Sequence, residues 1–245
     1  SRTRIATQRE IRYLKNSEKA GDQERARRLE QLYRYYGEQT CAADGLCATS
    51  CPMHINTADL THLLRQISSN QSKIKYPVGK AGAKHMPECE TAVKGLLTAA
   101  NLAHTVIGTK AMSAICETAH KTGLPLWTPA MPKPNHIDKK QLAGRNTAVD
   151  AARKGDDIDL KVVYFPSCLN QTMGLSKDAP VKETVSQEIC KVLNRAGYEV
   201  IFPDKMNHLC CGQIWESKGM MDIADRKTAE LEEALWKASE EGRYP

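Results

Sequence analysis

Apolar positions recur with helical spacing over the first part of the chain. Residues 5–40 are expected to form two helices separated at Gly21, the second with an apolar stripe along one face. Asn56 and Asp59 form a capping pair for a further helix, whose apolar side chains follow an i, i+3, i+4, i+7 pattern: Leu60, Leu63, Leu64 and Ile67. This part of the chain is therefore expected to be all helical.

Residues 69–91 are rich in Ser, Asn, Lys, Gly and Pro, and we expect a polar connection there. A long helix should follow over about 91–120, because apolar residues again recur with a period near 3.6. Prolines from 125 to 134 then predict an extended segment, with Leu126 and Trp127 held against a surface.

The period changes after residue 160. Two short apolar runs, 161–165 and 198–202, predict strands, and a helix between them ends at Gly197. Strand, helix and strand in this order predict a βαβ unit with parallel strands and a right-handed crossover. A last helix is expected over roughly 219–240.

Composition limits the function classes. The chain has 245 residues, a net charge of +6 and nine cysteines, and its first residues lack the apolar segment of a signal peptide. We therefore expect a cytoplasmic protein. In such a protein, clustered cysteines indicate metal or redox chemistry rather than a disulfide framework. The lysines are scattered with few aromatic residues between them, so nucleic-acid binding is not expected. No apolar run is long enough to span a membrane.

A cysteine run carries the clearest chemical signal. Cys41, Cys47 and Cys51, followed by Pro52, match the bacterial ferredoxin pattern C-x2-C-x2-C-x3-C-P, with Asp44 in place of one cysteine. An iron–sulfur cluster is the favoured interpretation, and a zinc knuckle or three unrelated thiols remain alternatives. Asp44 offers oxygen to a thiolate site, so it is either a weak, exchangeable ligand or no ligand.

A second set of thiols follows the two predicted strands. Cys168 comes after the first strand, and Cys210 and Cys211 lie in the loop after the second. The carboxyl ends of parallel strands share one edge of a sheet, where ligands usually bind, so the three thiols are expected to meet. Gly212 suits a sharp turn beside them. His208 is either an ordinary loop residue, a neighbour that lowers a thiol pKa, or a ligand.

The remaining cysteines carry a weaker signal. Cys116 and Cys190 sit beside apolar residues in predicted helices, where a thiol behaves as a small hydrophobic group. Cys89, expected in the polar connection, is a weaker candidate for a fourth cluster ligand.

The expected architecture is mixed. An all-α, ferredoxin-like iron–sulfur domain covers 1–135, a linker 136–159, and a cysteine-rich α/β domain 160–245. The charge follows this division, because residues 61–150 carry 12 basic and 5 acidic side chains, and residues 151–245 carry 13 and 16.

Three segments together resemble the C-terminal iron–sulfur portion of flavin-linked D-lactate dehydrogenases: Cys41 to Pro52, Pro166 to Gly174, and Cys210 to Gly219. The first segment is close to that family's version, including its Asp. The other two resemble the cysteine-rich CCG domain, which is shared with heterodisulfide reductase and with the iron–sulfur subunits of glycolate oxidase and anaerobic glycerol-3-phosphate dehydrogenase. The resemblance is weakest over 69–120.

The resemblance implies that this chain is a fragment of a longer electron-transfer enzyme. An FAD-binding module and a complete four-cysteine motif would precede it, and a further cysteine would follow its last residue. Cys41 and Cys47, with or without Asp44, would then share one 4Fe–4S cluster with an upstream cysteine, and Cys51 would complete another. The isolated chain is accordingly expected to be inactive, and colourless or only partly loaded with iron.

The implied function is an electron relay. FAD would oxidise D-lactate or a related 2-hydroxy acid, and the clusters would pass electrons to a quinone, a cytochrome or a redox protein, with the CCG thiols at the outlet. Membrane contact, if any, would be peripheral, at the inner membrane. No residue of this chain is expected to be catalytic in the oxidation itself.

Three alternatives remain open. The relay could serve glycolate or glycerol-3-phosphate oxidation instead. A structural zinc module would need only tetrahedral cysteine sites. A dithiol catalyst would use Cys210 and Cys211 to reduce a disulfide.

Overall fold

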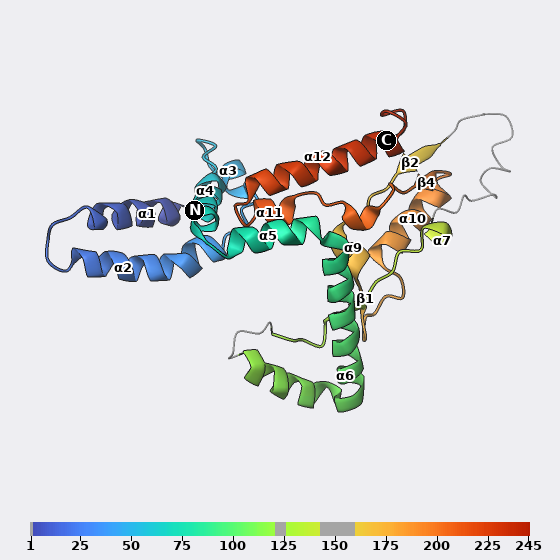
Figure 1. Ribbon diagram of the computed structural model, residues 1–245, viewed down its shortest axis with the longest axis horizontal. Helices are drawn as coiled ribbons and strands as arrows, with labels where there is room; N and C mark the ends of the chain where they lie inside the picture. Colours follow the sequence, from blue (N-terminus) through green and yellow to red (C-terminus); the bar gives the residue numbers. More distant parts are fainter. Residues whose placement is uncertain (1, 121–125, 143–159) are drawn as a thin grey trace. The chain divides into compact units, whose positions relative to one another are not determined.

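The contacts within the chain form two compact units. The computed structural model describes residues 2–120, 126–142 and 160–245 (Figure 1). The first unit contains Ser1–Ala83 and Gly212–Arg226, and the second contains Lys84–Cys211 and Lys227–Pro245. Most of the described residues are helical.

The first unit is built from helices. In chain order they are α1 (Arg2–Lys15), α2 (Asp22–Tyr33), η1 (Arg34–Gln39), α3 (Leu46–Thr49), α4 (Thr57–Gln71), α5 (Lys75–Lys84), α11 (Gln213–Glu216) and the start of α12 (Met221–Ala238) up to Arg226. The helices α1 and α2 lie side by side as an antiparallel pair (Figure 1), with Leu14 and Ala26 buried. Gly21 precedes α2 with a φ of +87°, a conformation that glycine adopts without steric cost. The expected helix pair is confirmed.

The polar connection expected at 69–91 is wrong in part, because α5 and the start of α6 (Met86–His120) lie there. Ala83 of α5 packs with Met220 and Ile223, and Tyr76 and Trp215 cover this small core. The apolar residues of α5 are too few to reveal a helix in the local sequence. Their partners come from residues more than 130 positions later, so only tertiary packing shows the helix.

The second unit combines helices with short strands. In chain order it contains α6, β1 (Pro132–Pro134), α7 (Lys139–Leu142), β2 (Lys161–Val163), α9 (Cys168–Thr172), β3 (Met173–Ser176), α10 (Val185–Arg195), β4 (Glu199–Ile201), η2 (Met206–His208) and the later part of α12 (Met221–Ala238).

The predicted βαβ unit is confirmed in its strands and their direction. Strands β2 and β4 pair in parallel with Val162 opposite Val200, and α10 packs against β4. The strands are shorter than expected, three residues each. Cys190 of α10 is buried, as expected for a core thiol. The carboxyl ends of β2 and β4 therefore lie side by side.

The proline-rich segment is extended, as expected, but it also pairs with another strand. β1 runs antiparallel to β3, with Pro132 opposite Ser176 and Pro134 opposite Met173. Proline cannot donate a backbone hydrogen bond, so within sheets it occurs mainly in edge strands such as β1. Trp127 is buried with its ring 4.8 Å from that of His104, which confirms the expected contact for Trp127. The same expectation is wrong for Leu126, whose side chain is exposed.

The long helix expected at 91–120 is present as α6, with a bend at Gly108. Gly108 has φ 75° and ψ 168°, a conformation open essentially to glycine. His104 Nε2 and Thr109 Oγ1 lie 2.9 Å apart across the bend.

Most of the linker expected at 136–159 lies outside the described residues, and the domain limits remain a prediction. The ferredoxin-like character of the helical part also remains a prediction. In the described part of the chain, no helix is long and apolar enough to cross a membrane.

Gly219 offers a test of the packing in the first unit. It has a φ of +75°, and a Cβ atom on it would lie 2.3 Å from Gln66 N and 2.5 Å from the Arg65 carbonyl carbon. Gly219→Ala should therefore lower the free energy of unfolding by about 2–5 kcal/mol, from backbone strain and overpacking together. Urea unfolding followed by circular dichroism measures the loss.

Gly21→Ala is the matched control. Its φ is also positive, but no heavy atom lies within 4 Å of the added Cβ position. Gly21→Ala should lower the free energy of unfolding by about 1–2 kcal/mol, from backbone strain alone. Equal losses in the two variants would show that the backbone of α4 does not confine residue 219.

Candidate functional site

The first cysteine loop runs from Cys41 to Pro52. Cys41, Cys47 and Cys51 are all half-buried, and Cys47 lies in the short helix α3. The backbone of this region turns through left-handed conformations at Ala43, Gly45 and His54. Non-glycine residues rarely adopt positive φ, so surrounding contacts must stabilise the turns at Ala43 and His54.

The sulfur of Cys47 lies against the amino end of the next helix, α4, and accepts hydrogen bonds there. The Thr57 hydroxyl lies 3.1 Å from Cys47 Sγ, and the Thr57 backbone N–H donates to the same sulfur over 3.3 Å. The Thr57 hydroxyl is the main cause that lowers the pKa of the Cys47 thiol. These hydrogen bonds stabilise the thiolate form of Cys47, the form that binds metals, relative to an unpaired thiol.

Asp44 has a structural partner inside the loop. Its Oδ1 accepts a hydrogen bond from Leu46 N at 3.1 Å, which closes the turn that leads into α3. This contact accounts for an aspartate here without a metal. Its role as a ligand remains a prediction.

The predicted cap of α4 is confirmed. Asn56 Oδ1 accepts from Ala58 N at 3.0 Å, and Asn56 Nδ2 donates to Asp59 Oδ1 at 2.7 Å. Because Thr57 is the next residue, the cap fixes the helix end that faces the Cys47 sulfur. Thr57 was missed as a site residue, although its place directly after the cap was a usable signal.

Arg65 was also missed by sequence reasoning, and it organises the loop from outside. Its guanidinium donates to the carbonyl oxygens of Glu38 at 2.5 Å, Cys41 at 2.7 Å and Ser217 at 2.8 Å. His62 lies on the same helix as Arg65, α4, and its Nε2 is 3.2 Å from the carbonyl oxygen of Ala43 in the loop. The Arg65 contacts join the first residue of the loop, Cys41, to the carbonyls of Glu38 in η1 and of Ser217 after α11.

The second set of thiols lies where the sequence predicts it. Cys168 begins α9 just after β2, and Cys210 and Cys211 follow β4 and η2. Cys210 is 1 % exposed and forms a side-chain hydrogen bond with Cys168, and Cys211 is exposed. Gly212 turns the chain into α11 with a φ of +80°, as expected.

The Cys168 thiol is acidic. The hydrogen bond with Cys210 is the largest cause, and with the backbone N–H groups of Leu169 and Cys168 it lowers the pKa of Cys168 from 9.0 to about 7. Burial and the nearby Cys211 oppose the shift. Cys168 and Cys210 thus form a pair in which one thiolate is accessible near neutral pH.

Side chains of α12 hold the loop that carries Cys210 and Cys211. Lys227 is 6 % exposed and donates from Nζ to His208 O at 3.2 Å and to Glu230 at 2.7 Å. Thr228 Oγ1 donates to Cys211 O at 3.2 Å. Nothing in the local sequence around the cysteines pointed to Lys227 and Thr228.

The weaker candidates are placed as follows. Cys190 is buried, and burial raises the pKa of its thiol. Cys116 is half-buried on α6. Cys89 is exposed and lies on α6, not in a polar loop as expected. His208 is exposed and serves the site through its backbone carbonyl.

In the described ranges of the chain, no three His, Cys, Asp or Glu side chains are grouped closely enough to hold a metal ion. Cys41, Cys47 and Cys51 share one loop, with Cys47 prepared as a thiolate, but they do not form a complete metal site there. Their assignment as cluster ligands stays a prediction.

Comparison with known proteins identifies one region. Residues 162–241 match the family model of the CCG cysteine-rich domain, a domain often linked to iron–sulfur electron transfer. The match contains Cys168, Cys210 and Cys211. No curated protein and no solved structure matches the chain.

The acidity of Cys168 predicts a pH profile for its alkylation. Above a midpoint near pH 7 the thiol is deprotonated and should react rapidly with iodoacetamide, and below it the reaction should slow. Cys210→Ala removes the hydrogen bond that contributes most to the low pKa of Cys168, so the midpoint of its alkylation should rise toward pH 9.0. Peptide mass spectrometry after timed alkylation resolves Cys168 from the other cysteines.

Cys89→Ala is the control for this measurement, because it removes an exposed thiol on α6. It should leave the Cys168 midpoint unchanged. A midpoint near 7 that survives Cys210→Ala would contradict the assigned cause.

Proposed function

We propose that this chain is the electron-relay portion of a flavin- and iron–sulfur-dependent D-2-hydroxyacid dehydrogenase that acts on D-lactate. Electrons would pass from FAD, bound elsewhere in the enzyme, to a quinone, a cytochrome or a redox protein. The observation that carries the proposal is that hydrogen bonds to sulfur lower a thiol pKa in each cysteine set, at Cys47 and at Cys168, and that Cys168 lies inside the CCG match.

The first loop fits a cluster in its donor chemistry. Cys47 Sγ already accepts hydrogen bonds from the Thr57 N–H and hydroxyl, and hydrogen bonds to sulfur are one of the factors that set cluster potentials. Cys41 and Cys51 supply further sulfur ligands from the same loop. A bound 4Fe–4S cluster would supply one-electron transfer there, which no side chain provides by itself.

The CCG thiols suit the outlet of the relay. Cys168 and Cys210 lie at the carboxyl edge of the β2–β4 pair, and Cys211 is exposed beside them. Electron transfer to a docked acceptor needs such a redox group near the surface. Hydride abstraction from D-lactate is assigned to the FAD-binding region, so the chain alone would be inactive.

A dithiol catalyst is the second candidate, and a specific observation favours it. The hydrogen-bonded Cys168–Cys210 pair, with a Cys168 pKa of about 7, resembles the poise of thiols that exchange with disulfides. The sequence predicts a dithiol catalyst that uses Cys210 and Cys211, whereas in the structure the hydrogen-bonded partner of Cys210 is Cys168.

The cluster assignment predicts a loss of iron in one variant. In the intact flavin-containing protein, Cys47→Ser should lower the iron and sulfide content and the visible charge-transfer absorption, because a thiolate ligand is replaced. Elemental analysis and absorption spectroscopy of anaerobically purified protein measure both. Cys190→Ser, at a buried thiol distant from the loop in sequence, should leave them unchanged.

Two results would overturn the cluster assignment. Stoichiometric zinc in a colourless intact protein would favour the structural zinc module. Iron content that is equal in Cys47→Ser and in the wild type would remove Cys47 from the ligands.

The relay and the dithiol catalyst differ in the effect of Cys210→Ser. In the relay, flavin reduction by D-lactate should persist while electron transfer to the acceptor falls, because only the outlet is changed. Stopped-flow absorption separates the two steps, and Cys190→Ser, at a core thiol, is the control. Unchanged transfer to the acceptor would contradict the outlet role, and loss of disulfide reduction would favour the dithiol catalyst.

A further inference from the structure

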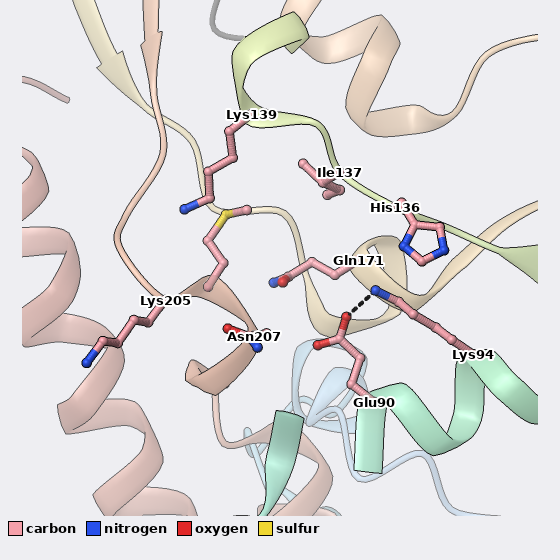
Figure 2. A pocket seen from close by; sticks show the side chains of 9 residues that line it. Glu90, Lys94, His136, Ile137, Lys139, Gln171, Lys205 and Asn207 are labelled. Atoms are coloured by element: carbon pink, nitrogen blue, oxygen red, sulfur yellow. Dashed lines mark ion pairs between the residues drawn. The ribbon is translucent and has the colours of Figure 1, made fainter. Parts of the chain in front are cut away.

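A polar cavity in the second unit lies outside the thiol site. Its volume is about 250 Å³, and polar side chains from four parts of the chain line it together with Ile137 and Met206: Glu90, Lys94, His136, Lys139, Gln171, Lys205 and Asn207 (Figure 2). Gln171 belongs to α9, the helix that begins at Cys168, and Lys205 precedes η2. The cavity is therefore built partly from the elements that also position the thiols.

The single carboxylate among these residues is already neutralised. Lys94 Nζ lies 2.6 Å from Glu90 Oε1, one turn apart on α6, and the two side chains are only 20 % and 14 % exposed. A partly buried pair of this kind contributes little net charge to the cavity.

Lys139 adds a charge that Glu90 does not offset. Its Nζ donates to the carbonyl oxygen of Pro203 at 2.9 Å. An ammonium group has three N–H donors, so this contact leaves donor capacity on a half-buried cation. Lys205 lies at the rim with an exposed side chain and adds to the positive potential.

Neutral donors complete the lining. Gln171 is 5 % exposed, and its Nε2 donates to Pro166 O at 2.8 Å, which fixes the side chain. Figure 2 shows Gln171 extending between Asn207 and the Glu90–Lys94 pair. The His136 ring lies on the same side as Lys94 (Figure 2). A ligand that accepts hydrogen bonds and carries negative charge would complement this set.

We propose that this cavity binds a small oxyanion, a carboxylate or a phosphate. The lining offers a surplus of cationic and amide donors over uncommitted acceptors, and the volume suits a molecule of a few heavy atoms. The inference does not depend on the proposed electron relay, because it rests on the charges and donors of the cavity alone.

Titration of the chain with inorganic phosphate, and separately with D-lactate, tests the proposal and distinguishes the two anions. Isothermal calorimetry at constant ionic strength, with chloride as the balancing ion, should show saturable binding of at least one. Lys139→Met keeps most of the side-chain volume and should weaken that binding about tenfold or more, through loss of a charge-assisted hydrogen bond. Lys177→Met, at an exposed lysine outside the cavity, should have no effect.

A second variant moves affinity in the other direction. Glu90→Gln removes the carboxylate that neutralises Lys94 and should tighten anion binding roughly three- to fivefold. Damage to the fold would not strengthen binding, so this variant keeps the test informative if Lys139→Met is unstable. The proposal fails if neither anion saturates in the millimolar range, or if Lys139→Met and Glu90→Gln both bind like the wild type.

Discussion

Each cysteine loop is tied by side chains of a helix, which donate hydrogen bonds to backbone carbonyls in or beside the loop, and the rest of the site depends on this anchoring. In the first unit the donor is Arg65, whose planar guanidinium reaches the carbonyls of Glu38, Cys41 and Ser217. In the second unit Lys227 and Thr228 bind the carbonyls of His208 and Cys211. In both cases a helix anchors a loop through its main chain, which leaves the cysteine sulfurs available for chemistry.

Anchoring the main chain also sets the state of the thiols. Because the first loop is held in place, Cys47 meets the Thr57 hydroxyl and N–H at the amino end of α4. The loop after β4 is fixed in the same way, so Cys210 can stabilise the thiolate of Cys168. The lowering of the pKa of Cys47 and of Cys168 thus follows from backbone placement, and it suits both metal ligation and thiol exchange. The donor chemistry alone does not separate the proposed relay from a dithiol catalyst, and the match of residues 162–241 is to a domain often linked to iron–sulfur electron transfer.

In the second unit, α9 and the segment around η2 each contribute to two sites. Cys168 and Gln171 lie three residues apart on α9, the first in the thiol pair and the second in the cationic cavity. Lys205 has a left-handed backbone before η2, and Cys210 follows η2. A bound oxyanion and the thiol pair would therefore be held by the same short elements of structure.

The sequence by itself determined three features: the helices of residues 2–71, the parallel pairing of β2 with β4, and the proximity of Cys168 to Cys210. Each follows from local periodicity, from the Asn56 cap or from the rule that parallel strands share a carboxyl edge. Only the tertiary structure decided the roles of Arg65 and Lys227, the helix α5 and the pairing of β1 with β3. These depend on contacts between residues far apart in the chain, and a single sequence carries no local signal for which carbonyl a distant side chain will reach.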